Sequence, residues 1–236
     1  MKISYFKSFI ITLIFIVLVI IDNELKLYKY GIPFITLSYF VACLFLIDRK
    51  IIDYKLLKFK AKDVFMVIIS AIGFYIVNLI LSIVPYIITS NKITIPIDVV
   101  YSVKNITILI LIVPIAEELF FRGLLTHGIS LVHNNKSAVL VSSIIFALLH
   151  YYSGGILIAF LGGLYFGYIY VKTENIFLSI IAHIFANTII LFDERIIEFI
   201  TNKIDLTSNI FMLLVLFIIG VTVCIFSLKK ISPAGS

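Results

Sequence analysis

Three charged side chains lie inside one long apolar segment, where charge is costly. Glu117, Glu118 and Arg122 fall within six residues of this segment. Each would cost about 2.5–3.5 kcal/mol at the centre of a membrane helix, even on the lenient insertion scale. Glu118 and Arg122 are four residues apart, so they share one helical face and can form an ion pair. Glu117 is rotated about 100° from Glu118 and is free to face a cavity, although it could also be a spectator of a structural pair.

Two histidines and an asparagine interrupt two later apolar runs. His150 ends the run that contains Phe146, and His183 lies in the middle of another run with Asn187 four residues later. A structural interpretation is open for each, because a histidine at a helix end is often interfacial and a His–Asn pair can hold membrane helices together. Taken jointly with the glutamates, these groups instead indicate a catalytic set.

The residue types suit hydrolysis of an amide bond by an activated water. That reaction needs a base to deprotonate the water, donors aimed at the developing oxyanion, and an acid for the leaving amine. Glutamate, histidine and asparagine can supply all of these roles. Covalent catalysis is disfavoured, because Ser142 and Ser143 have no recognisable partner and Cys43 and Cys224 lie outside the polar region.

Zinc is the alternative that the residue types leave open. Glu117, His150 and His183 would form a catalytic set of two histidines and one glutamate, with water in the open position. The chain contains no HExxH segment to preorganise two ligands on one helix. We therefore favour a mechanism without metal or cofactor and keep zinc as the alternative.

The composition predicts an all-α, polytopic membrane protein. Hydrophobic residues make up 62% of the chain and charged residues 14%, with a mean hydropathy of +1.18, whereas soluble domains are about 45–50% apolar and about 25% charged. A spanning helix needs about 20 mostly apolar residues. We predict about eight transmembrane helices in one bundle, a single transmembrane domain over residues 1–236. The predicted runs are Tyr5–Ile21, Ile32–Ile47, Val64–Ile87, Ile106–Leu125, Ser137–His150, Gly155–Val171, Ile176–Phe192 and Asn209–Leu228.

The distribution of Lys and Arg predicts the orientation. With a cytoplasmic N-terminus, 13 of the 19 basic residues lie inside and 6 outside, which favours cytoplasmic N- and C-termini by the positive-inside rule. The basic loop Arg49–Lys62 is expected to contact anionic lipid headgroups. The net charge of +6 therefore indicates membrane topology, and nucleic acid is not an expected partner.

The polar groups also spell three motifs, in the order EExxxR, FxxxH and HxxxN: Glu117, Glu118, Arg122; Phe146, His150; His183, Asn187. Over about Ile106–Phe192 the chain resembles the CAAX-protease and bacteriocin-processing family of intramembrane proteases, also called the Abi family. The resemblance implies an eight-helix bundle with a catalytic cavity open toward the cytoplasm. It also implies hydrolysis of a peptide bond near the membrane, with the catalytic core at about 106–192.

The resemblance implies a role for each motif residue. Glu117 would activate water, His150 would assist it, and His183 with Asn187 would stabilise the oxyanion. The supporting residues would be Glu118, Arg122 and Phe146.

Two further classes of function are kept as alternatives. The same fold could serve as a bacteriocin-immunity or regulatory scaffold that does not cut, and a transporter is less favoured because intramembrane carboxylates and histidines also serve transport. The composition is rich in Ile, Lys and Asn, as in bacteria with AT-biased coding. Prenylated proteins are not expected there, so we predict a membrane-associated peptide or lipidated protein as substrate, at the cell membrane.

One expectation conflicts with a role for His150. Helical rise places Glu117 and His183 roughly 10 Å from the inner face, whereas His150 would lie nearer 20 Å if its helix begins at Ser137. The predicted boundaries therefore separate His150 from Glu117 in depth.

Overall fold

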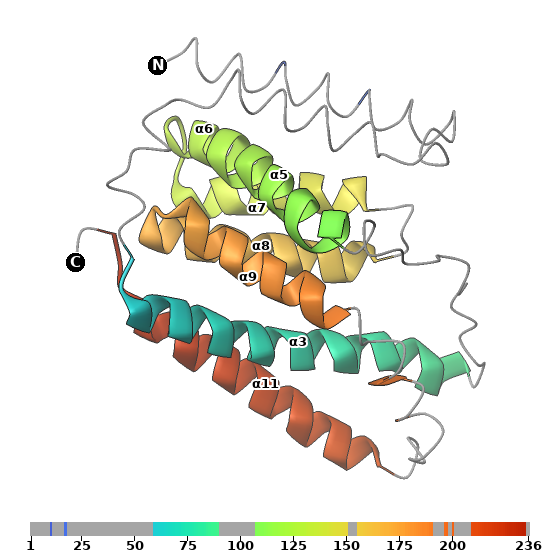
Figure 1. Ribbon diagram of the computed structural model, residues 1–236. Helices are drawn as coiled ribbons and strands as arrows, with labels where there is room; N and C mark the ends of the chain where they lie inside the picture. The colour runs from blue at the N-terminus through green and yellow to red at the C-terminus, as the bar shows by residue number, and fades with distance from the viewer. Residues whose placement is uncertain are drawn as a thin grey trace. The chain divides into compact units, whose positions relative to one another are not determined.

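The structure, a computed structural model, describes residues 59–89, 107–150, 155–190 and 209–234, together with residues 10, 17, 196, 197 and 200. Every regular element in these ranges is a helix (Figure 1), which confirms the all-α class for the described part of the chain. The six predicted runs from Val64–Ile87 onward correspond to helices. The first two runs, Tyr5–Ile21 and Ile32–Ile47, lie almost wholly outside the described residues, so the total of eight spans stays a prediction.

Three helical segments are long and apolar enough to cross a membrane: Ala61–Val84 in α3 (Ala61–Thr89), α8 (Ile156–Thr173) and α11 (Ile210–Lys230). Two further apolar helices, α7 (Asn135–Leu149) and α9 (Ile176–Ile190), are shorter. These candidate spans indicate a multi-pass membrane protein.

The described chain forms two compact units. The first contains Leu111–Ile180, and the second contains Lys60–Ile110 and Ile181–Ser232. Helix α9 begins in the first unit and continues into the second. The single domain predicted over residues 1–236 stays a prediction.

A helix of mixed type carries the first charged motif. Its consecutive parts are the π-helix η4 (Ile108–Ile112), α5 (Val113–Glu118), the π-helix η5 (Leu119–Thr126) and α6 (His127–Ser130). The predicted end of this run at Leu125 is therefore five residues too early. In a π-helix each N–H bonds to the carbonyl five residues back, a rare geometry that is frequent at functional sites. Glu118 and Arg122 lie on either side of the α5–η5 junction.

Helix α7 follows after a short turn and begins at a side-chain cap. The Oδ1 atom of Asn134 accepts a hydrogen bond of 2.8 Å from the backbone N–H of Ser137. This cap satisfies one of the otherwise unpaired N–H groups of the first turn, so the helix begins two residues before the predicted Ser137. Its 15 residues are fewer than the about 20 that a spanning helix needs.

Helices α7 and α8 lie side by side at close range (Figure 1). A Cβ atom added at Gly163 would lie 2.8 Å from Cα of Ser143, and one added at Gly167 would lie 2.9 Å from Cγ1 of Val139. Both distances are shorter than a carbon–carbon contact allows. The Gly163–Gly167 spacing therefore permits close packing of membrane helices.

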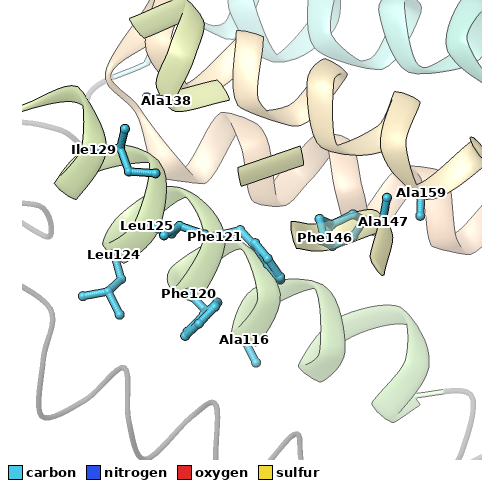
Figure 2. Close-up of a cluster of buried hydrophobic side chains, with 10 residues drawn as sticks. All are labelled: Ala116, Phe120, Phe121, Leu124, Leu125, Ile129, Ala138, Phe146, Ala147 and Ala159. Carbon is cyan, nitrogen blue, oxygen red and sulfur yellow. The ribbon is translucent and has the colours of Figure 1, made fainter. Parts of the chain in front are cut away.

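A buried apolar cluster joins the mixed helix to α7 and α8. Figure 2 shows the ten side chains that form it: Ala116, Phe120, Phe121, Leu124, Leu125, Ile129, Ala138, Phe146, Ala147 and Ala159. The rings of Phe121 and Phe146 meet edge to face with their centroids 4.8 Å apart. This contact brings the helical segments that carry the first and second motifs together in one core.

The second unit is built on α3 and α11, which lie side by side (Figure 1). A Cβ atom at Gly73 would lie 2.6 Å from the backbone nitrogen of Cys224, so the two helices touch through their backbones. At one end of the pair, Oδ1 of Asp63 accepts a hydrogen bond of 2.9 Å from the backbone N–H of Ser232. The second unit also contains the part of α9 from Ile181 onward.

Candidate active site

The predicted ion pair of the EExxxR motif is present and deeply buried. Arg122 Nη1 lies 3.0 Å from Oε1 of Glu118, with side-chain exposures of 1% and 0%. The second oxygen of Glu118, Oε2, accepts a hydrogen bond of 2.5 Å from the hydroxyl of Ser179 at the start of α9. Glu118 is thus bound on both oxygens by groups from two helical segments.

The guanidinium group of Arg122 has further partners around it. Its Nη2 donates a hydrogen bond of 3.0 Å to the backbone carbonyl of Gly163 on α8. Its Cζ lies 5.8, 5.3 and 5.5 Å from the ring centroids of Phe121, Phe146 and Phe166, respectively. Aromatic faces at these distances stabilise a cation that has lost its water. Arg122 therefore links the mixed helix to α7 and α8.

Thr126, at the end of the π-helix η5, touches both its own backbone and α7. Its Oγ1 lies 2.7 Å from the carbonyl of Phe121, five residues earlier, and 2.8 Å from Oγ of Ser142. Ser142 also donates to the carbonyl of Val139, and so does Ser143. These contacts give both serines hydrogen-bond partners within the helix packing.

Glu117 and His150 lie together in the first unit. His150 Nε2 is 4.0 Å from Oε1 of Glu117, and the two side chains are 32% and 12% exposed. The expected separation in depth is therefore wrong. The mixed helix continues to Ser130, so Glu117 lies about 20 Å from the turn by helical rise. Helix α7 brings His150 back to a similar level from the same turn.

The FxxxH motif orients the imidazole of His150. The Nδ1 atom lies 2.8 Å from the carbonyl oxygen of Phe146, one helical turn earlier. A carbonyl only accepts hydrogen bonds, so Nδ1 carries the proton and a neutral ring presents an unprotonated Nε2 toward Glu117. The ring of Phe146 also packs on that of His150, with centroids 4.4 Å apart. Phe146 thus contacts both His150 and Arg122.

His183 and Asn187 lie on α9, within the second unit. His183 is buried and Asn187 is half-buried. His183 and Asn187 are four residues apart, and Ser179 lies four residues before His183. All three residues therefore lie along one stripe of the helix. Their convergence with Glu117 and His150, which belong to the first unit, stays a prediction.

The comparison with protein families covers these motifs. Residues 99–189 match the family described as type II CAAX prenyl endopeptidase Rce1-like. This segment is an Rce1-like domain. The match confirms the CAAX-protease resemblance, and its bounds lie close to the predicted core at about 106–192. No curated protein and no solved structure gives a match to the chain.

The Rce1-like domain brings two of the three predicted zinc ligands together. Glu117 and His150 are neighbours, and the bond from Nδ1 to Phe146 leaves Nε2 of His150 as the nitrogen that a metal would use. Within the described part of the first unit, no third His, Cys, Asp or Glu completes a metal-holding group with them. The third predicted ligand, His183, is in the second unit, so the zinc set stays a prediction.

The Rce1-like domain also contains residues that the sequence analysis did not single out. Ser179 binds Glu118, the carbonyl of Gly163 binds Arg122, and Phe166 supplies one of the three rings. A signal for Ser179 was present, since it precedes His183 by the same four residues that separate His183 from Asn187. Nothing in the sequence marks Gly163 as the partner of Arg122, because every residue has a backbone carbonyl.

Proposed function

We propose that this chain is an intramembrane endopeptidase in which Glu117 activates a water molecule to hydrolyse a peptide bond. The observation that carries the proposal is the pairing of Glu117 with His150 beside a separate, buried ion pair. The family match supports a protease, because the matched family is described as an endopeptidase.

The geometry of the pair suits the binding of a water molecule. Two acceptors 4.0 Å apart are too distant for a direct hydrogen bond. A water that donates to Oε1 of Glu117 and to Nε2 of His150 at about 2.8 Å would subtend an angle of about 90°, near the angle between its own two hydrogens. Both hydrogens are then engaged, and the lone pairs of the oxygen point outward toward a substrate carbonyl.

The reaction then balances with the residues present. Glu117 takes one proton from the water as the oxygen forms a bond to the carbonyl carbon of the substrate. When the carbon–nitrogen bond breaks, Glu117 returns that proton to the leaving amine. Glu118 is unsuited to this role, since its two oxygens are held by Arg122 and Ser179 and its side chain is 0% exposed.

The developing oxyanion needs donors, which we assign to His183 and Asn187. A neutral imidazole has one N–H and the amide of asparagine has two, so both can donate without adding charge. The loss of one such donor typically lowers turnover by about 10²–10³-fold. His150 keeps the water oriented and is itself oriented by the carbonyl of Phe146.

The substrate is proposed to be a membrane-associated peptide or a lipidated protein. The matched family is described as a CAAX prenyl endopeptidase, which supports a protein substrate. The three candidate spans support a substrate that is associated with a membrane. A bacteriocin-related substrate belongs to the same class and stays a prediction.

The test is comparative peptidomics of cells that express wild type, Glu117→Gln or the control Glu174→Gln. Glu174 is an exposed glutamate at the end of α8, so its substitution makes the same chemical change outside the site. We expect peptides that appear with wild type and Glu174→Gln and vanish with Glu117→Gln. Identical peptide sets in all three would favour the scaffold or transporter alternatives.

A further inference from the structure

Ser179 connects the buried ion pair to helix α9. Its hydroxyl has one hydrogen, and the distance of 2.5 Å to Oε2 of Glu118 is typical of a hydroxyl donating to a carboxylate. The carbonyl of Phe166 lies farther away, at 3.1 Å, and cannot donate. Ser179 is 0% exposed, so water does not compete for this bond.

Ser179 differs in its bonding from the other buried serines of the first unit. Ser142 and Ser143 lie on α7 and donate to the carbonyl of Val139 on their own helix, and Ser142 also accepts a hydrogen bond from Thr126 of η5. Ser179 donates to a side chain 61 residues away in the chain. A bond of that kind constrains the rotation and the axial position of a helix, which a bond within the helix cannot do.

The helix that Ser179 constrains carries the two proposed oxyanion donors. His183 follows one turn later, at about 6 Å along the axis and about 40° around it, and Asn187 follows after another turn. Because α9 is one continuous helix, a rotation at Ser179 turns both side chains with it. A misplacement of about 1 Å in a catalytic group can cost about 10²-fold in rate.

We infer that Ser179 is a positioning residue, which through its hydrogen bond to Glu118 sets the rotation of α9 and hence the aim of His183 and Asn187. The inference rests on the proposed function for its effect on rate. The inference assigns a second role to Glu118 of the EExxxR motif, because this residue then orients α9 as well as neutralising Arg122.

The first test is a double-mutant cycle on peptide cleavage. Ser179→Ala should lower kcat by about 10- to 100-fold with little change in KM, and Ser179→Thr, which keeps the hydroxyl, should recover part of the loss. In a His183→Ala, Asn187→Ala background, Ser179→Ala should cost little more, because both groups that it aims are already absent. Equal losses in both backgrounds would overturn the inference. The matched control is Ser143→Ala, which removes an equally buried hydroxyl.

The second test does not depend on activity. In a Cys43→Ser, Cys224→Ser background, a single cysteine at position 187 or 185 samples opposite sides of α9. We expect Ser179→Ala to change the ratio of maleimide labelling rates at these positions, and Ser143→Ala to leave the ratio unchanged. An unchanged ratio in Ser179→Ala would overturn the inference even where cleavage is seen. A changed ratio together with cleavage that survives Glu117→Gln would uphold it and reject the proposed function.

Discussion

Replacement of Arg122 by alanine would leave Glu118 as a buried carboxylate without its cation. The carboxylate is 0% exposed, and among its contacts the hydroxyl of Ser179 would remain. The same substitution removes the donor to the Gly163 carbonyl and empties the space between three phenylalanine rings. Every consequence of the change therefore falls in one buried region.

The expected cost follows from this burial. Removal of one partner from a buried ion pair costs about 3–5 kcal/mol, because the remaining charge cannot be solvated. That is a large share of the roughly 5–15 kcal/mol that stabilises a typical domain. For a chain of this size, each kcal/mol of lost stability lowers the melting temperature by about 2–4 °C. The Arg122→Ala protein should therefore melt about 6–20 °C below wild type.

The assay is thermal unfolding monitored by circular dichroism, with all variants in the same detergent. Lys136→Ala is the control, since Lys136 is an exposed cation of the same unit and its loss should leave the melting temperature unchanged. The double variant Glu118→Gln, Arg122→Met removes both charges and should recover much of the lost stability. An Arg122→Ala protein that melts with the Lys136→Ala control would refute the assignment of a buried, stabilising ion pair.

Three other predictions concern the reaction and the topology. Glu117→Gln should fold normally and lose about 10²–10⁴-fold in turnover, and residual activity within tenfold of wild type in a cleavage assay would contradict its role as base. His183→Ala should lower turnover without a change in metal content, whereas elemental analysis showing stoichiometric zinc that tracks activity would favour the zinc alternative. Positions 203 and 55 lie outside the described residues and test the orientation on intact cells. A single cysteine in place of Lys203 should react with an impermeant maleimide, and one in place of Lys55 should not. The reverse pattern would invert the predicted orientation.

Features that depend on helical periodicity were predictable from the sequence. The Glu118–Arg122 pair and the bond from His150 to the Phe146 carbonyl both join residues four apart, which any helix of about this pitch brings together. The apolar runs also predicted the six described helices, since burial in a membrane requires long apolar segments.

Features that join distant parts of the chain were decided by the tertiary structure. The neighbouring positions of Glu117 and His150 depend on where the mixed helix ends, and an error of five residues in that boundary moves a side chain by about 7 Å along the axis. The bonds from Ser179 to Glu118 and from Arg122 to the Gly163 carbonyl span 61 and 41 residues. A buried charge demands partners, but only the packing of the helices selects which distant hydroxyl or carbonyl supplies them.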